Sequence, residues 1–342
     1  MKYDFQSEKL TSRVVAIGGG TGLSTMLRGL KKYFENITAV VTVADDGGGS
    51  GMLRRDLGVA PPGDVRNCIL AMAEAEPVLK KLFDYRFPEG TLEGQSFGNL
   101  FLAAMTGISK NFSQAVQRVS DVLAVTGDVF PVTDAANMRL CAKLTDGSVI
   151  CGESNIGHAR ADGSRIESVF LDPADVMPTE NVITAISRAE LILLSSGSLY
   201  TSIIPNLLVK GVADAIYRAK APTIYVCNIM TQPGETVGYR ASDHVRAIEQ
   251  HAGHAIVDCV IANEGAVDEE ILRRYHADGV DMVEIDHENF RDAFLVTGDY
   301  TDIRPGEKGS IVRHNTEKLA RDIRRIALDM METKQLIRGG KS

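Results

Sequence analysis

Residues 13–24 read Arg13-Val-Val-Ala-Ile-Gly-Gly-Gly-Thr-Gly-Leu-Ser24, a short apolar run that breaks into glycines. The run at 14–17 is β-branched or small and has the length of a buried strand. Apolar side chains then recur at helical spacing from Leu23 to Phe34. The stretch therefore predicts a strand, a glycine loop and a helix, the opening unit of a parallel α/β sheet.

The loop itself has the chemistry of an anion site. It consists of Gly18, Gly19, Gly20, Thr21 and Gly22. Free N–H groups at a helix start, aided by the helix dipole, favour phosphate. The alternative is a βα loop that uses glycine for tight packing alone. The dinucleotide fingerprint is matched incompletely, because its third glycine position falls on Leu23, and no lysine follows as in a P-loop.

Composition excludes several classes of protein. With 37 basic and 45 acidic residues among 342, the net charge is −8, and no block of like charge argues for a nucleic-acid surface. No apolar run approaches the ~20 residues of a membrane span, and the polar N-terminus lacks a signal-peptide core, so we expect a cytoplasmic protein. The 5 cysteines have neither disulfide-scaffold nor zinc spacing, which favours structural or surface roles.

An acidic pair follows the second expected strand, Ile37–Val43. Asp45 stands in the region where a Rossmann-like unit holds a ribose hydroxyl with an acid. Asp45 and Asp46 could instead hold Mg²⁺ on a nucleotide phosphate, or form an acidic turn exposed to water. The glycine run at 47–51 predicts a mobile or ligand-approached loop.

Two further helix starts carry small polar residues. Pro61-Pro-Gly-Asp-Val-Arg-Asn67 gathers Asp64 and Asn67 before an apolar helix. Phe97-Gly-Asn-Leu100 places Gly98 and Asn99 at the opening of another. Simple N-capping is the alternative interpretation of each start.

The character of the sequence changes between about 119 and 172. Short β-rich runs are joined by turns such as Asp146-Gly147, and Asp-Gly between alternating runs is a hairpin signal. We expect an antiparallel insertion. For its Arg139, Glu153 and His158, surface roles are favoured over a place in a site.

The α/β pattern then resumes with a second strand, small-residue loop and helix. Glu190–Leu194 predicts a buried strand, and Ser196, Gly197 and Ser198 behind it could hold a second phosphate or a sugar. Pro205-Asn206 starts the next helix, which is expected to include Ile216.

Other polar residues follow later strands. Asn228 comes after the strand Thr223–Cys227, a further strand is expected at Ala255–Ile261, and Arg313 precedes a helix at Glu317–Glu332. In open parallel sheets, ligands bind at the carboxyl edge where the strand order reverses. The glycine loop, the acidic pair, the serine loop and Asn228 are therefore expected to form one composite site.

Several long strings resemble the bacterial gluconeogenesis factor family, which is related to the 2-phospho-L-lactate transferases of coenzyme F420 biosynthesis. They are Ala16-Ile-Gly-Gly-Gly-Thr-Gly-Leu-Ser24, Val41-Thr-Val-Ala-Asp-Asp-Gly-Gly48, Pro61-Pro-Gly-Asp-Val-Arg-Asn67, Phe97-Gly-Asn-Leu100, Gly197-Ser-Leu-Tyr-Thr-Ser-Ile-Ile-Pro-Asn206 and Tyr225-Val-Cys-Asn-Ile-Met-Thr-Gln-Pro-Gly-Glu-Thr236. The sequence departs from the family where Ser195-Ser196 replaces Gly-Pro and where Gly49 and Met52 replace a serine and an arginine.

The resemblance implies a Rossmann-like three-layer fold in a cytoplasmic protein needed for normal cell shape on gluconeogenic carbon sources. It also implies a bound nucleotide sugar of the UDP-N-acetylglucosamine type. By motif position that ligand would lie on Gly18 to Gly22, Asp45, Asn67, Asn99, Gly197, Ser198 and Asn228. The transferase relatives use Mg²⁺, which makes Asp45, Asp46 and Asp64 the candidate metal region.

We therefore expect a three-layer α/β/α domain over 11–330, with a mostly parallel sheet, the insertion at about 119–172 and a disordered tail at 331–342. A regulatory protein that binds a UDP-sugar or an NAD(P)-like dinucleotide, without a required cofactor, is the leading hypothesis. No nucleophile, general base or metal cluster stands out, so no catalytic residue is assigned. The alternatives are a Mg²⁺-dependent phosphotransferase and an NAD(P)-dependent oxidoreductase. A homo-oligomer is one option for the assembly.

Overall fold

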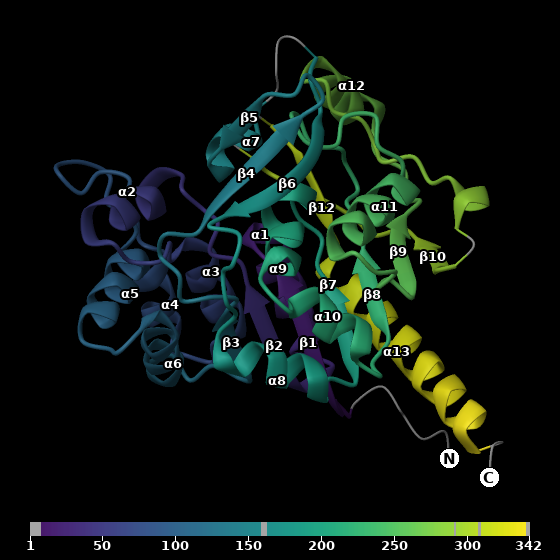
Figure 1. The fold of residues 1–342 in the computed structure, drawn as a ribbon, viewed down its shortest axis with the longest axis horizontal. Coiled ribbons are helices and arrows are strands. Elements are labelled where there is room, and N and C mark those ends of the chain that lie inside the picture. The colour runs from purple at the N-terminus through teal and green to yellow at the C-terminus, as the bar shows by residue number, and fades with distance from the viewer. Residues whose placement is uncertain (1–7, 159–162, 291, 307–308, 340–342) are drawn as a thin grey trace.

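A computed structural model describes residues 8–158, 163–290, 292–306 and 309–339. Its centre is a sheet of seven parallel strands (Figure 1). These are β1 (Leu10–Gly18), β2 (Phe34–Val41), β3 (Asp128–Pro131), β7 (Leu191–Leu194), β8 (Thr223–Val226), β9 (Cys259–Asn263) and β10 (Phe294–Gly298). The strand order is β10-β9-β8-β7-β1-β2-β3.

The central strands are apolar on both faces. Residues 14–17 of β1 and all of β7 and β8 are buried. A parallel strand covered by helices on both sides needs such a continuous apolar run. The chain builds the sheet from β1 outward through β2 and β3, then returns to place β7 on the other side of β1. The strand order therefore reverses between β1 and β7, which is where ligands bind in open α/β sheets.

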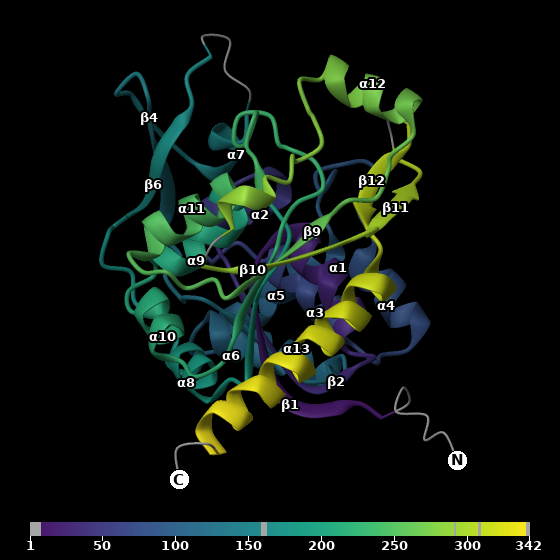
Figure 2. The same cartoon turned by 90° about the vertical axis from the view of Figure 1, so that its right-hand side faces the viewer.

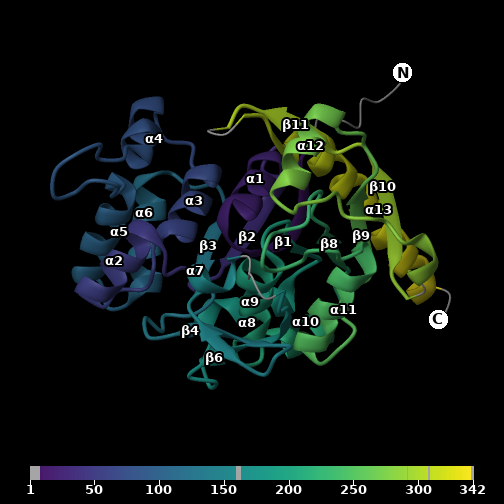
Figure 3. The same ribbon diagram turned by 90° about the horizontal axis from the view of Figure 1, so that it is seen from above.

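Helices cover both faces of the sheet, as the view from above shows (Figure 3). One face carries α1 (Gly20–Leu30), α3 (Gly63–Met72), α6 (Phe112–Val122) and α13 (Thr316–Gly339). The other carries α8 (Glu180–Arg188), α9 (Ile204–Leu208), α10 (Val212–Arg218) and α11 (Ala241–Ala252). Figure 2 shows α13 running diagonally across its face, where Leu319 and Ile323 are buried in the main core. These layers confirm the predicted three-layer α/β/α fold.

The remaining elements lie around this centre. Beyond β3 lie α2 (Gly48–Leu57), α4 (Pro77–Asp84) and α5 (Phe97–Gly107) (Figure 1). A small antiparallel sheet in the order β5-β4-β6 consists of β4 (Arg139–Leu144), β5 (Val149–Cys151) and β6 (Ile166–Asp172), with α7 (Glu153–Ile156) attached. The second half adds a π-helical turn (Leu199–Ile203), α12 (Glu269–Ala277), a 3₁₀ turn (His287–Asn289) and the hairpin of β11 (Thr301–Arg304) and β12 (Ile311–His314).

Two predicted helices have different bounds. The first, expected to include Phe34, ends at Leu30, because Phe34 begins β2, where it pairs with Leu10 and is 0% exposed. Because Phe34 follows Leu30 by four residues, the sequence pattern assigns it to a further turn of the helix. The helix expected from Pro205 to Ile216 is split into α9 and α10, because Val209 is extended and Gly211, with a φ of +82°, precedes the start of α10.

The glycine run at 47–51, predicted to be a mobile or ligand-approached loop, belongs to the start of α2. The Asp45 carboxylate accepts the Gly47 N–H at 2.9 Å just before the helix. A Cβ at Gly51 would lie 1.9 Å from the Asp46 carbonyl oxygen, so glycine is required by a close backbone approach. The acidic pair therefore organises this helix start.

Other predicted ranges shift by several residues. The strand expected at Ala255–Ile261 is β9, Cys259–Asn263, because the chain joins the ladder only after Asp258. Residues 128–131, within the range expected for the insertion, form the edge strand of the parallel sheet. Helix α13 continues through 331–339, where the sequence predicts a disordered tail, and 340–342 lie outside the described residues.

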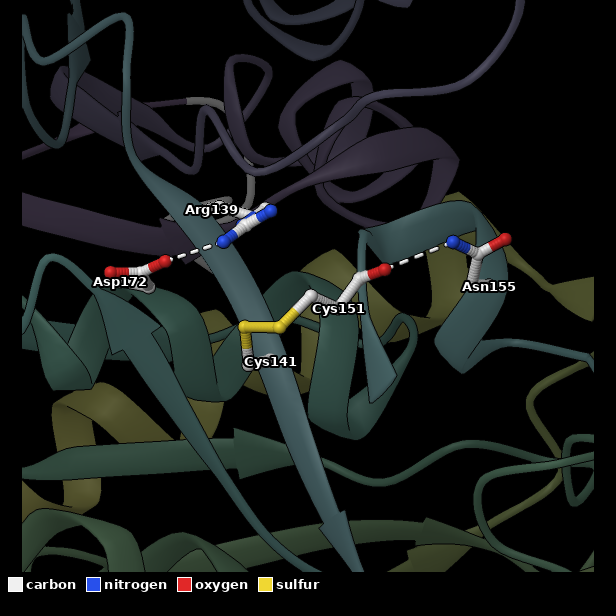
Figure 4. Close-up of a disulfide and its surroundings, with 5 residues drawn as sticks. All are labelled: Arg139, Cys141, Cys151, Asn155 and Asp172. Atoms are coloured by element: carbon white, nitrogen blue, oxygen red, sulfur yellow. Dashed lines mark hydrogen bonds and ion pairs between the residues drawn. A yellow bond between two sulfur atoms is a disulfide. The ribbon is translucent and has the colours of Figure 1, made fainter. Parts of the chain in front are cut away.

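Two of the cysteines form a bridge that their spacing did not predict. Cys141 and Cys151 form a disulfide between β4 and β5 (Figure 4). The hairpin register places them directly opposite each other, on either side of the Asp146-Gly147 turn. Cys68, Cys227 and Cys259 are free and buried. Spacing rules for disulfide-rich scaffolds overlook a bridge that one hairpin creates.

Among the described helices, none is both long enough and apolar enough to cross a membrane.

Candidate functional site

The two small-residue loops meet at the point where the strand order reverses. Gly18 to Gly22 follow β1, and Ser195 to Ser198 follow its neighbour β7. A Cβ at Gly22 would lie 1.7 Å from the Ser196 carbonyl oxygen, and one at Gly18 would lie 2.0 Å from the Ser195 hydroxyl. These two glycines let the loops touch, so the packing interpretation holds for them.

Gly20 differs from those two glycines. Its φ is +60°, and the nearest atoms to an added Cβ lie 3.8 and 3.9 Å away. The space beside it is therefore open. Together with Gly19 and Thr21, Gly20 lines a cavity of about 520 Å³ at the start of α1. That volume lies in the range of roughly 300–1,000 Å³ found for small-molecule sites.

Two buried or half-buried amides fix the loops. The Asn228 side chain accepts the Gly197 N–H at 2.9 Å and donates to the Gly197 carbonyl at 2.8 Å. Asn206 is 0% exposed, and its Nδ2 donates to the Gly18 carbonyl at 3.1 Å and to the Ser202 carbonyl at 2.8 Å. Backbone groups of both loops are thus held by side chains from elements that follow β7 and β8.

The cavity brings together most of the residues predicted for a site. Its walls include Gly19, Gly20, Thr21, Gly22, Asp45, Asp64, Ser196, Gly197, Ser198, Asn228 and Arg313. Gly18, Asp46, Asn67, Gly98, Asn99 and Asn206 are not among the described lining residues. The convergence of the loops on one edge of the sheet follows from the strand order.

The residues outside the lining have structural partners. Asp46 accepts the Ser154 N–H at 2.9 Å. Asn67 accepts a hydrogen bond from Arg66 at 2.6 Å, and Gly98 leaves room for the same arginine, whose Cδ would lie 2.7 Å from an added Cβ. The Asn99 N–H donates to the Ser96 hydroxyl at 3.1 Å, which caps α5. These contacts are structural, but they are not the N-caps that the sequence offered as the alternative, because Ser96 caps α5 and α3 follows Pro62 without a side-chain cap.

One wall of the cavity is apolar and was not foreseen. It consists of Ile229, Met230, Tyr275, Val280 and Val312. Ile229 and Val312 belong to a small second core, against which Met230 and Tyr275 pack. These residues come from segments far apart in the chain, so no local pattern marks them. Arg313 stands beside this wall, is exposed, and is the one lysine or arginine among the described lining residues.

Another part of the lining is acidic and includes Asp45, Asp64 and Glu153. Burial, with a contribution from the charge of Asp45, raises the pKa of Asp64 to about 7, although a hydrogen bond from the Gly20 N–H acts the other way. Burial and the charges of Asp45 and Asp46 raise the pKa of Glu153 to about 7. The expectation of a surface role is therefore wrong for Glu153, which lines the cavity.

Helix α7 places Glu153 there. Gly152 has a φ of +101°, and a Cβ at this position would lie 2.5 Å from an Asp46 carboxylate oxygen. The Asn155 side chain donates to the Cys151 carbonyl at 2.9 Å, next to the disulfide (Figure 4). Arg139, by contrast, pairs with Asp172 at 2.6 Å and does not line the cavity, and His158 is exposed.

The described part of the chain offers no cluster of side chains placed to hold a metal ion. No group of three or more His, Cys, Asp or Glu side chains there is placed to hold an ion. Backbone N–H groups and one arginine face an acidic wall, so the cavity can bind an anionic group on one side and hydroxyl or cationic groups on the other.

Fold and site together define the class of protein. A parallel sheet between two layers of helices, with two small-residue loops where the strand order reverses, is typical of a Rossmann-like α/β protein. The family model for the 2-phospho-L-lactate transferase CofD matches residues 14–297. Curated relatives extend this match to nearly the whole chain.

The gluconeogenesis factor of Bacillus subtilis (strain 168) is 44% identical over 309 residues, covering 90% of this chain and 96% of that protein. A relative from Thermoanaerobacterium thermosulfurigenes is 54% identical over 311 residues, covering 90% and 94%. A solved structure of a UPF0052 family protein from Bacillus halodurans superposes with a TM-score of 0.86 at 41% identity, covering 92% of this chain and 99% of that one. The chain belongs to the gluconeogenesis factor family, which is related to the 2-phospho-L-lactate transferases.

Proposed function

We propose that this protein binds a nucleotide sugar of the UDP-N-acetylglucosamine type and acts as a regulator of cell morphogenesis on gluconeogenic carbon sources. One observation carries the proposal: the loops after β1 and β7 meet beside a cavity of about 520 Å³. The start of α1 suits a diphosphate, although the Gly20 N–H already donates to Asp64, and the apolar wall suits a base. Membership in the gluconeogenesis factor family supports the regulatory role.

Gly20 allows the ligand to be tested without disturbing the loop contacts. In Gly20→Asp, a carboxylate would stand in the open space beside the helix start, where it opposes a phosphate but suits the helix dipole. Repulsion between charges about 5 Å apart at an effective dielectric constant of about 20 predicts roughly 100-fold weaker binding. Isothermal titration with UDP-N-acetylglucosamine measures this change.

Gly20→Ala is the matched control, because it imposes the same left-handed backbone conformation on a side chain without a charge. We expect its affinity to stay within about threefold of wild type. A flat titration of folded wild-type protein would contradict the proposal. Titration with reduced nicotinamide dinucleotide in parallel distinguishes a nucleotide sugar from an NAD(P)-like ligand.

A second candidate is a Mg²⁺-dependent phosphotransferase. The acidic wall supports it, since burial and the charge of Asp45 raise the pKa of Asp64 and both carboxylates line the cavity. Asp45 and Asp64 are oxygen donors of the kind that Mg²⁺ prefers, and they would hold it. Bound there, the ion would offset the charge of a transferred phosphoryl group. The test is Mg²⁺-dependent release of a nucleoside monophosphate from a nucleotide-linked donor, lost in Asp45→Asn.

A further inference from the structure

A second hollow of about 250 Å³ adjoins the main cavity. The two spaces share Glu153, Ser198, Gln232 and Pro233 as lining residues. The second hollow is completed by Ser154 of α7 and by Glu235, among others. Its described lining includes Glu153 and none of the apolar-wall residues. A ligand held on the glycine loop can extend into it past Ser198.

The walls of this hollow are unlike those of a phosphate site. Among the described residues that line it there is no lysine or arginine, and two are glutamates. An anionic group would meet two carboxyls there, with the imidazole of His158 as the one described lining side chain able to carry a positive charge. Hydroxyl groups, by contrast, can donate to carboxylates and accept from amides. The chemistry of the walls thus favours a neutral group rich in hydroxyls.

The polar side chains form one connected network with the loop that lines the main cavity. Asn228, which holds Gly197, also donates to Gln232 Oε1 at 3.3 Å. Gln232 Nε2 in turn donates to the Ser198 hydroxyl at 2.8 Å. A group bound in the second hollow would therefore contact side chains that are already fixed by the first site.

Glu235 anchors the far side of the hollow. It is 7% exposed and accepts the Tyr200 N–H at 3.1 Å and the Thr201 hydroxyl at 3.3 Å. The Thr201 hydroxyl also contacts Glu153. The Ser198 hydroxyl also contacts Glu235. One Thr201 hydrogen cannot serve both carboxyl groups, so a ligand donor would chiefly complete the contacts of Glu153. Burial raises the pKa of Glu235 to about 7, which lets this carboxyl donate as well as accept near neutral pH.

We propose that this hollow is the subsite for the neutral, hydroxyl-bearing sugar of the nucleotide ligand, with Glu153 and Gln232 as the residues that recognise it. This inference rests on the proposed nucleotide-sugar function. It fixes the direction of the ligand in the site: base on the apolar wall, diphosphate on the glycine loop and sugar against α7. Glu153 then determines selectivity for the sugar and leaves the nucleotide part unaffected.

The experiment compares UDP, UDP-N-acetylglucosamine and UDP-glucosamine by isothermal titration on wild type, Glu153→Gln and Gln232→Ala. We expect wild type to bind UDP-N-acetylglucosamine at least tenfold more tightly than UDP. Glu153→Gln should lose about tenfold for the sugar nucleotide, the equivalent of one charge-assisted hydrogen bond, and stay within twofold for UDP. Gln232→Ala should also weaken the binding of UDP-N-acetylglucosamine, by about fivefold.

Glu89→Gln serves as the control, because Glu89 is exposed and lies in neither cavity. Thermal unfolding of each variant confirms that it is folded. Equal loss of UDP and sugar nucleotide in Glu153→Gln would overturn the subsite and leave the proposed function standing. Tighter binding of the amino sugar than of the acetylated one would overturn the neutral-sugar assignment. Failure of wild type to bind either UDP or the sugar nucleotide would instead refute the proposed function.

Discussion

The β1 loop and α7 line the same cavity but reach it in different ways. The loop follows a buried central strand and packs on the loop after β7 so closely that a Cβ added at Gly18 or Gly22 would lie 2.0 Å or less from it. Helix α7 is carried by the small antiparallel sheet and is secured by the Cys141–Cys151 disulfide and the Gly152 turn. The β1 loop is thus a wall that belongs to the core, whereas α7 is a wall attached to the core by the small sheet. Changes in the first should therefore destabilise the whole fold, and changes in the second should act locally.

The largest effect is expected at Gly22. In Gly22→Ala the added methyl would lie 1.7 Å from the Ser196 carbonyl oxygen, and the backbone on both sides must shift. We expect a loss of about 3 kcal/mol in the free energy of unfolding, as for other overpacked core positions. Urea unfolding measures this loss. Gly107→Ala is the control, because nothing lies within 4 Å of its added Cβ, and it should change stability by no more than ~1 kcal/mol.

The disulfide tests the other side of the comparison. The double variant Cys141→Ser, Cys151→Ser removes a bridge across a sequence separation of 10, which in chain-entropy terms contributes up to about 3 kcal/mol. Backbone pairing of β4 with β5 and the Gly152 N–H bond to the Leu140 carbonyl at 2.8 Å remain. Hydrogen exchange should therefore rise in residues 139–158 and stay unchanged in β1 and β7.

Reductant provides the control for this prediction. It should reproduce the effect in wild type and have none in the double variant. Equal acceleration of exchange across both sheets would show that the attached wall is as integral to the fold as the glycine loop.

A smaller, pH-dependent effect is expected at Glu153. Its folded pKa of about 7 lies above the usual 4.5, so the folded protein holds this proton more tightly than the unfolded chain does. The resulting stabilisation is fully present below pH 4.5 and is lost as the pH rises through 7. Between pH 4.5 and 8, the unfolding free energy should therefore decline less steeply in Glu153→Gln than in wild type. The difference should stay below about 2 kcal/mol, because the side chain is half-buried.

Urea unfolding at the two pH values measures this change, with Glu89→Gln as the exposed control. An unchanged slope in Glu153→Gln would mean that its carboxyl is solvated like an ordinary surface group, and would remove it from the acidic wall.

Local sequence patterns predict the core wall well. Val14 to Ile17 and Leu191 to Leu194 are continuous apolar runs, as buried parallel strands require, and the small residues behind them mark the loops. Their meeting then follows from the strand order. The glycine run at 47–51 misleads, because Gly51 serves a close contact with Asp46 inside a helix start, and glycine content alone cannot separate that from a flexible loop.

The attached walls depend on tertiary packing that no short pattern encodes. Glu153 reaches the cavity only because the hairpin register and the Gly152 turn direct α7 towards Asp46. The apolar wall unites Ile229, Tyr275 and Val312, which follow or belong to three separate elements. Asp146-Gly147 does locate the hairpin. Cys141 and Cys151 lie at nearly equal distances on either side of this turn, and that is the one signal from which the disulfide could have been predicted.

The central claim is that one ligand spans both walls at the switch point between β1 and β7. A crystal structure of the protein with UDP-N-acetylglucosamine tests it most directly. The account predicts the diphosphate beside Gly19 to Thr21 and Gly197, with the sugar against Glu153 and Gln232. A nucleotide bound outside this cavity, or one whose sugar points to the apolar wall, would contradict it.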